Sequence, residues 1–459
     1  MRHSLGGALL AAAACAPAPS SVRSAPPTPV STVPVATISS VSEGKPPIRL
    51  PPPLLPVDCD AAARDGKVDF CGEEVSVDAR HVACHSPYQV DIGVLACLPE
   101  VRSITLRRSG VIRLAPLSNL QHLARLNLSD TLVSDLTPLA YLPRLEDLGL
   151  DNTPVVDVTP LSRVASLQYL RLRGCRDVDL SGLSSLRQLR SLSAEGTDFD
   201  DLSPLAGHPH LVGVGLPTGI ADLTPLATMP ALRTLVIQKF GPSATSTAVD
   251  RPSTPQRLRE VGNLPRLKEL VLLDVTLGEM TSLGSLDSLE ELWLRTEGNI
   301  PFKAIGQLTT LKSLKVEAAY RGISLGDLKG LGGKLLDLHT LELHSAPPDT
   351  SFLKDFNKLL DLTLAAYGPR PLDLRGLAGL PRLWRLELKA GTVQSLAPLR
   401  SVKRLHHVKL GVRVEVPDRE VAALRRARPD LKLDQEKDDW DDADDWDDAE
   451  DDDDDWYDD

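Results

Sequence analysis

The sequence predicts a solenoid of the α/β class, with a curved parallel β-sheet on the concave side and short 3₁₀ or α turns on the convex side. Three observations lead to this prediction. Leucine is the commonest apolar residue, whereas the 459 residues include only 6 Phe, 6 Tyr and 5 Trp. One leucine pattern recurs at a fixed period. The last two apolar residues of the pattern are separated by one residue that would point outward, as in a strand with one buried face.

The recurring pattern is Leu-x-x-Leu-x-Leu, and its phase continues through residues 101–416. The first six matches are separated by steps of 22 residues, and some later steps contain insertions. About 14 repeats begin at Val101, Leu123, Leu145, Leu167, Leu189, Leu211, Leu232, Leu267, Leu289, Leu311, Leu338, Leu359, Leu383 and Leu405. Because one coil cannot bury its apolar face alone, neighbouring coils are expected to stack, with parallel strands paired between them.

The return segments between the strands carry a second signature. Residues 135–139 read Asp-Leu-Thr-Pro-Leu, and close variants recur at residues 157–161, 201–205 and 222–226. Ser or Thr followed by Pro suits the cap and the first residue of a helical turn, because Pro lacks only a donor that would be unpaired there. We therefore expect a short turn at the back of each repeat.

With this repeat length and this return segment, the chain resembles the leucine-rich-repeat proteins of the internalin type, which are bacterial surface proteins. The resemblance covers most of the chain and is specific for the fold. It implies an extracellular binding protein of the adhesin or receptor kind, and it does not identify the partner.

The first residues are typical of a secretory signal. Residues 1–14 begin Met-Arg-His and continue with small and apolar residues as far as Ala14. The run Ala12-Ala13-Ala14-Cys15 resembles a bacterial lipobox, so we expect Cys15 to carry a lipid; cleavage without lipidation is the alternative. Residues 15–56 are rich in Pro and should form a disordered, extended stalk. The expected location is the bacterial envelope, facing the periplasm or the exterior.

Residues 57–100 contain four cysteines just before the first repeat, where the end of the stack must be covered. They are Cys59, Cys71, Cys84 and Cys97. In an exported chain they predict two disulfides of unknown connectivity, and a zinc site is the less favoured alternative because close Cys-x-x-Cys pairs are absent. Cys175 occupies the ninth repeat position and is expected to face inward as an unreactive thiol.

The far end of the array has its own cap and tail. In residues 417–433 the spacing of Val421 and Leu424 predicts an amphipathic helix, followed by a final strand. Residues 434–459 hold 18 Asp or Glu and one Lys, with Trp and Tyr among them, and are predicted to be a disordered acidic tail. The tail either aids solubility or docks on a basic surface, which belongs to a partner or to this chain.

The residue between the two inner apolar positions of each strand should line the concave face. In the middle of the array this position is apolar in three successive repeats. The candidate contact residues there are Val236, Val271, Leu273, Trp293, Arg295 and Lys315, with Tyr169, Arg171 and Trp384 as weaker candidates. Aromatic and Arg side chains dominate affinity at many interfaces, so this patch predicts a protein-binding centre. In the alternative interpretation, the insertion at residues 241–255 folds over the patch.

The sequence contains no nucleophile elbow, phosphate-binding loop or His-Glu-x-x-His motif, and its histidines lack metal-site spacing. Outside the acidic tail the charges nearly balance, which disfavours nucleic-acid binding. We therefore predict a monomeric, non-enzymatic protein-binding module without a cofactor or metal, attached to the membrane through its lipid alone. A structural spacer or assembly factor for envelope components is one alternative, and a non-catalytic subunit of an enzyme complex is another.

Overall fold

The computed structural model describes residue 59 and residues 64–86, 88, 90–220, 222–238, 260–275, 281–296, 298–318 and 323–436. The chain divides into two units, Met1–Pro53 and Leu54–Asp459, and all described residues belong to the second. The predicted signal peptide, the lipidation of Cys15, the Pro-rich stalk and the insertion at residues 241–255 lie outside the described residues. The acidic tail from residue 437 onward lies outside them as well.

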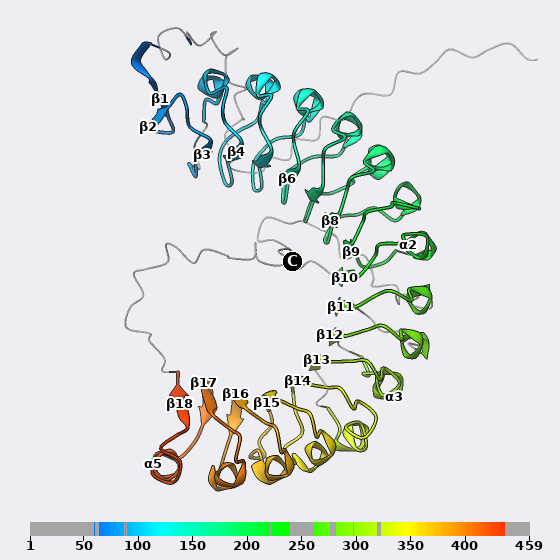
Figure 1. Cartoon of the computed structure of the whole chain (residues 1–459), viewed down its shortest axis with the longest axis vertical. Helices are drawn as coiled ribbons and strands as arrows, with labels where there is room; N and C mark the ends of the chain where they lie inside the picture. Colours follow the sequence, from blue (N-terminus) through cyan, green and yellow to red (C-terminus); the bar gives the residue numbers. More distant parts are fainter. Residues whose placement is uncertain are drawn as a thin grey trace, which may run out of the picture. The chain divides into compact units, whose positions relative to one another are not determined.

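A sheet of 16 strands extends through the second unit, and its spatial order from β3 to β18 is the order of the sequence (Figure 1). Neighbouring strands are parallel. The strands are β3 (His81–Ala83), β4 (Ser103–Thr105), β5 (Arg125–Asn127), β6 (Asp147–Gly149), β7 (Tyr169–Arg171), β8 (Ser191–Ser193), β9 (Gly213–Pro217), β10 (Thr234–Gln238), β11 (Glu269–Leu273), β12 (Glu291–Thr296), β13 (Ser313–Ala318), β14 (Thr340–His344), β15 (Asp361–Ala365), β16 (Arg385–Thr392), β17 (His407–Glu415) and β18 (Lys432–Gln435). Strands β4 to β17 follow the fourteen predicted repeat starts one by one, and the predicted parallel solenoid is confirmed.

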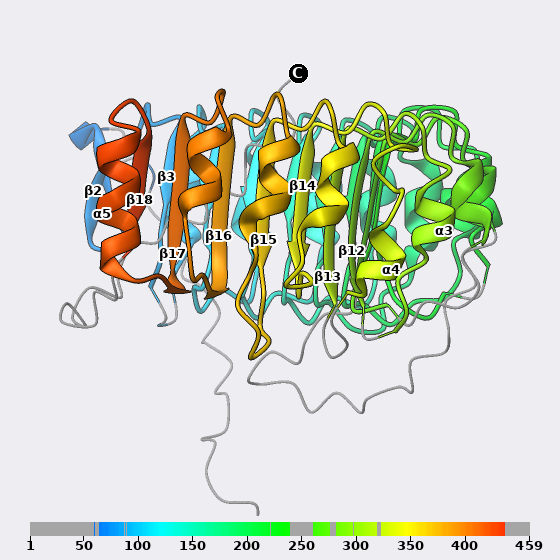
Figure 2. The same ribbon diagram turned by 90° about the horizontal axis from the view of Figure 1, so that it is seen from below.

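Short helical turns lie on the side of the coils opposite the strands (Figures 1 and 2). They are η1 (Gly93–Cys97), η2 (Ala115–Asn119), η3 (Thr137–Tyr141), η4 (Thr159–Arg163), η5 (Leu180–Ser185), η6 (Ser203–Leu205), α2 (Thr224–Ala227), η7 (Glu260–Asn263), η8 (Thr281–Ser285), α3 (Phe302–Ile305), α4 (Leu325–Leu328), η9 (Ser351–Asp355), η10 (Leu374–Gly379) and η11 (Ala397–Ser401). Most are single 3₁₀ turns, as predicted.

The residue that caps these turns differs from the expectation. Thr137 is the first residue of η3 and does not cap it; Asp135 does, because its Oδ1 accepts the backbone N–H of Thr137 at 2.9 Å. The same two-residue arrangement joins Asp157 to Thr159 and Asp349 to Ser351, at 2.8 Å each. A carboxylate has the reach to satisfy this free amide from outside the turn, so the Asp of the signature serves as the cap.

The interior between sheet and turns is a continuous stack of leucines. The inner residues of β6, Leu148 and the following Leu150, are both 0% exposed, and their equivalents in other coils are similarly buried. The ninth position faces inward as predicted. Thr153 Oγ1 donates to the carbonyl of Leu150 at 2.6 Å, and the buried Cys175 Sγ donates to the same carbonyl at 3.0 Å. Burial raises the pKa of the Cys175 thiol.

An antiparallel hairpin of β1 (Lys67–Phe70) and β2 (Glu73–Ser76) precedes the first coils. Two disulfides join this cap, Cys59 to Cys97 and Cys71 to Cys84, so the four cysteines pair among themselves as disulfides. Such bonds are typical of proteins that fold in an oxidising compartment. Among the described residues, no helix is long and apolar enough to cross a membrane.

The other end is covered by helix α5 (Asp418–Ala427), with Val421 and Leu424 buried, and by β18 (Figure 2). The predicted boundary at residue 433 is wrong. Strand β18 extends to Gln435, and the backbone N–H of Glu436 donates to the carbonyl of Leu410 at 2.8 Å. The first residues of the predicted acidic tail therefore belong to the sheet, because their main chain completes the pairing with β17.

Candidate protein-binding face

One outward position per strand forms a continuous line across the sheet, which we call the central row. Pairwise register joins its members in sequence from Thr105 to Asp434. The row consists of Thr105, Asn127, Gly149, Arg171, Ser193, Gly215, Val236, Val271, Trp293, Lys315, Glu342, Thr363, Glu387, Lys409 and Asp434. The register thus brings the three predicted apolar residues together on adjacent strands.

Trp293 and Lys315 form the centre of this row. The ammonium nitrogen of Lys315 lies 3.8 Å from the centroid of the Trp293 ring, which is the geometry of a cation–π contact. The indole Nε1 of Trp293 has no hydrogen-bond partner among the described residues. That nitrogen is buried, so the part of the ring open to a ligand is apolar, and the cation on one side holds the ring in place.

Arg295 lies beside Trp293, one outward position further along β12. Its Nε and Nη2 donate to the two carboxylate oxygens of Asp274 at 3.0 and 2.8 Å. Glu317 on the next strand lies 3.9 Å from its Nη1. Because Asp274 holds the guanidinium as a bidentate pair, Arg295 is oriented but its charge is largely neutralised.

Two of the predicted contact residues are less accessible than the sequence implied. Val271 is 8% exposed and Leu273 is 5% exposed, whereas Val236 and Trp293 keep an intermediate exposure. Val271 is paired on one side with Val236 and on the other with the large indole of Trp293, and side chains converge on a concave face. Val271 and Leu273 therefore contribute little exposed surface to the patch.

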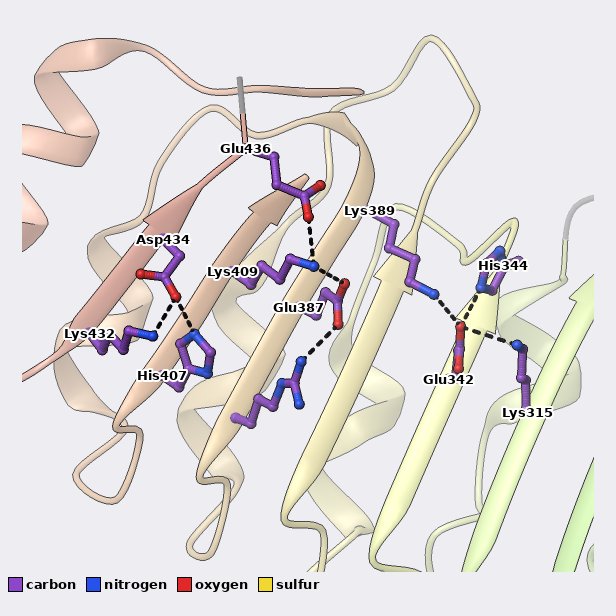
Figure 3. Close-up of polar contacts among 11 residues, drawn as sticks. Lys315, Glu342, His344, Glu387, Lys389, His407, Lys409, Lys432, Asp434 and Glu436 are labelled. Atoms are coloured by element: carbon purple, nitrogen blue, oxygen red, sulfur yellow. Dashed lines mark hydrogen bonds and ion pairs between the residues drawn. The ribbon is translucent and has the colours of Figure 1, made fainter. Parts of the chain in front are cut away.

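A network of ion pairs follows on the next strands, centred on Glu342 (Figure 3). Its Oε1 accepts from His344 Nε2 at 2.6 Å and from Lys389 Nζ at 2.7 Å, and Lys315 Nζ lies at 3.8 Å. Burial by itself would raise the pKa of Glu342, but the hydrogen bonds and the nearby cations outweigh it and lower this pKa to about 2. Glu342 is therefore an anion throughout the physiological range.

Two further clusters of ion pairs lie toward the last strand (Figure 3). Lys409 pairs with Glu387 at 3.5 Å and with Glu436 at 2.6 Å. Asp434 Oδ2 lies 2.8 Å from His407 Nε2 and 3.0 Å from Lys432 Nζ. Sequence reasoning missed this arrangement, and the only available signal was the alternation of charge between central-row positions.

The earlier strands carry the weaker candidates Tyr169 and Arg171. Both are partly buried on β7, and Arg171 Nη2 lies 3.1 Å from Asp147 Oδ1 on β6. Nearby, Glu195 is 4% exposed and pairs with Arg173 at 3.2 Å. Burial raises the pKa of Glu195 in spite of the Arg173 charge.

Trp384 lies just before β16, at the entry edge of the sheet, and is 50% exposed. It stacks on His406 with ring centroids 6.4 Å apart, and Leu360 on the preceding repeat is 37% exposed. Backbone hydrogen bonds join Leu360 to Trp384 and Trp384 to His406 on successive strands. The sequence analysis did not group Leu360 and His406 with Trp384, because nothing in the repeat pattern marks the position before each strand as exposed.

The described residues contain no group of three or more His, Cys, Asp or Glu side chains that could hold a metal ion. The site is thus a broad sheet face with an aromatic centre and a charged flank.

This architecture, with one strand and one short turn per repeat and a leucine stack between them, defines a leucine-rich-repeat solenoid. Comparison with solved structures agrees on the fold. An LRR protein of Leptospira interrogans aligns over 78% of this chain and 90% of its own, with a TM-score of 0.53 and 17% identity. The protein in a TLR13–ssRNA13 complex aligns over 78% of this chain and 52% of its own, with a TM-score of 0.56 and 17% identity.

An internalin from Listeria monocytogenes also aligns, over 79% of this chain and 89% of its own, with 20% identity and a TM-score of 0.45. No family model matches the sequence, and no curated protein matches it.

Proposed function

We propose that this protein is a non-enzymatic binding module that recognises a protein partner through the concave sheet face, with Trp293 at the contact centre. The observation that carries the proposal is the central row. Sixteen strands present one continuous face whose backbone is already ordered, so little conformational entropy is lost on binding. Trp293, Lys315 and Arg295 supply the aromatic and cationic side chains that concentrate affinity at interfaces.

The charges of this face favour protein over nucleic acid as the ligand. The TLR13 structure holds an RNA, but on β13 to β18 of this chain each Lys of the central row lies within reach of a carboxylate. A phosphate backbone requires cations that are free to replace its counterions. Alternating charges suit a protein surface with its own alternating charges.

We further propose that the module is displayed on the bacterial envelope and anchored through a lipid on Cys15. The two disulfides support an exported protein, and the Ala-Ala-Ala-Cys run supports lipidation. Metabolic labelling with a fatty-acid analogue tests the anchor, because Cys15→Ser should abolish incorporation. Labelling that persists in Cys15→Ser would reject lipidation at this residue.

Site-specific photo-crosslinking tests the binding face. A photoreactive residue at position 236 probes the concave side, and one at position 141 probes the convex side, where Tyr141 is 58% exposed. We expect a partner to be captured at position 236 and not at position 141. Adding Trp293→Ala to the concave probe should weaken capture by about thirtyfold, the effect of losing a hot-spot residue of about 2 kcal/mol.

Tyr141→Ala is the matched control, because it also truncates an aromatic residue but on the opposite side of the coils. Equal capture on both sides would contradict the proposal, as would unchanged capture by a folded Trp293→Ala protein. The identity of the captured protein then separates recognition of a foreign ligand from assembly of envelope components.

A further inference from the structure

The C-terminal cap of this chain carries a surplus of positive charge. Residues 396–432 contain ten Lys or Arg against four Asp or Glu, a net charge of +6. Residues 433–459 carry a net charge of −17, so residues 1–395 have a net of −1 when the whole chain has −12. The chain thus places its basic surplus and its acidic surplus next to each other.

Helix α5, the turn η11 and the residues that follow η11 carry most of these cations. We define the basic cap as six exposed side chains: Arg400, Lys403, Arg404, Arg419, Arg425 and Arg426. Helix α5 packs alongside η11 in the same direction. Glu420 near its start accepts the backbone N–H of Leu396 at 3.0 Å, and Arg428 after its end donates to the carbonyls of Val402 and Leu405 at 3.0 and 2.8 Å.

This packing sets the neighbours within the basic cap. Because the end of α5 lies beside residues 402–405, Arg425 and Arg426 come to the level of Lys403 and Arg404. Among the described residues none of the six forms an ion pair. The Lys residues of the central row, by contrast, have carboxylate partners.

We propose that the basic cap binds residues 437–459 of the same chain. These residues carry 16 Asp or Glu and one Lys, and pairs of acidic residues alternate with Trp440, Ala443, Trp446 and Ala449. Carboxylate pairs suit the Arg side chains, and an indole between them stacks on a guanidinium plane. The proposal concerns a different surface from the concave face and does not depend on the proposed function.

The attachment point makes this binding intramolecular. Glu436 pairs with Lys409 and is the last described residue, directly after β18, the strand that follows α5. Helix α5 has ten residues and is about 15 Å long, and 23 further residues can span about 75 Å when extended. The reach is ample. A tethered segment has an effective concentration of about millimolar, so modest affinity is enough for occupancy.

Zero-length carbodiimide cross-linking of the full chain tests the proposal, because it joins a carboxylate to the amine of Lys403 in the basic cap. We expect mass spectrometry to find Lys403 linked to Asp or Glu of residues 437–459. The yield should fall by roughly tenfold in Arg419→Glu/Arg425→Glu/Arg426→Glu and should fall with added salt, since the attraction is screened.

The matched control reverses three exposed arginines far along the chain, Arg102→Glu/Arg113→Glu/Arg190→Glu, and should keep the Lys403 links. A mixture of ¹⁵N-labelled and unlabelled chains distinguishes links within one chain from links between two. If the reversal disturbs the helix, Arg419→Gln/Arg425→Gln/Arg426→Gln replaces it. An equal yield of Lys403 links in the basic-cap variant and in the control variant would overturn the proposal. Links that form only between chains would also overturn it.

Discussion

The early and the late repeats share one core but end their strands differently. Strands β4 to β8 have three residues each, whereas β10 to β17 have between five and nine. In the early repeats a residue with positive φ follows shortly after the strand at a 22-residue spacing: Arg108, Asp130, Asn152, Gly174 and Gly196. These residues lie three positions past the end of each strand, and Asp130 and Asn152 still donate their backbone N–H to the next coil at 2.7 Å each. Asp, Asn and Gly tolerate the left-handed conformation better than most residues.

Several late strands are longer, although Asp274 after β11 and Ser345 after β14 also have positive φ, and the late strands connect to one another through ion pairs on the concave face. Lys389 on β16 reaches across β15 to Glu342 on β14. In the early repeats, contacts such as Asn152 to Asp130 at 2.8 Å join neighbouring turns, beside the ion pair of Arg171 with Asp147 at 3.1 Å between β7 and β6. The same leucine repeat is therefore compatible with contacts between coils at the strands or at the turns. The outward residues determine which contacts form.

The largest expected effect tests whether the core is the same in both regions. Leu148→Ala in the early repeats and Leu343→Ala in the late repeats each remove a side chain that is 0% exposed. We expect each to lower the free energy of unfolding by about 2–5 kcal/mol, measured by chemical denaturation. A loss confined to one region would show that the two regions do not share one core.

The second prediction uses a buried glutamate from each region. Glu342→Gln should lower the free energy of unfolding by about 2 kcal/mol, because each pKa unit corresponds to about 1.4 kcal/mol and solvent weakens part of the interaction. Glu195→Gln should raise the stability at pH 7, because burial disfavours the charge of this residue. Chemical denaturation at pH 7 measures the change in the free energy of unfolding for each variant. Changes of the same sign in both variants would refute the contrast.

The pH dependence follows from the same pair. The pKa of Glu342 is lowered, so its contribution is complete above the usual value of 4.5 and is lost as the pH falls toward about 2. The pKa of Glu195 is raised, so its neutral form stabilises the fold at low pH, and this contribution disappears as the pH rises through the folded pKa. Relative to the wild type, Glu342→Gln should lose less stability on acidification between pH 4.5 and 2.

A smaller effect is expected at the turn caps, which occur in both regions. Asp157→Ala in the early repeats and Asp349→Ala in the late ones each leave a backbone amide without its acceptor. Thermal unfolding should show a loss of about 1 kcal/mol in each case. The Asp→Asn variants keep an acceptor oxygen and serve as controls; if they lost as much as the alanine variants, capping would not be the cause.

The smallest effect is expected for an exposed ion pair. Lys312 and Glu290 lie 2.6 Å apart, and their side chains are 55% and 30% exposed. Lys312→Met should change the free energy of unfolding by less than about 0.5 kcal/mol, and salt should reduce that change further. A change comparable to that of Glu342→Gln would mean that the late repeats depend on surface pairs as well as on half-buried ones.

The sequence by itself determined the coil, the strand register and the interior. Every repeat faces the same burial problem with the same leucine spacing, so one solution recurs, and the predicted outward row matches the observed pairings residue by residue. The even number of cysteines indicated disulfides, and the helical spacing of Val421 and Leu424 located the C-terminal cap.

The tertiary structure alone decided which outward residues are accessible, how charges pair and which cysteines join. Val271 lies between Val236 and Trp293 on the adjacent strands and is buried. Glu342 stays ionised because His344 and Lys389, the latter 47 residues away, hydrogen-bond to it. The Asp caps and the extension of β18 to Gln435 also depend on where the backbone of the turn or of the neighbouring strand lies. These features arise between coils, where the repeat pattern fixes the spacing but not the identity of the side chains that meet.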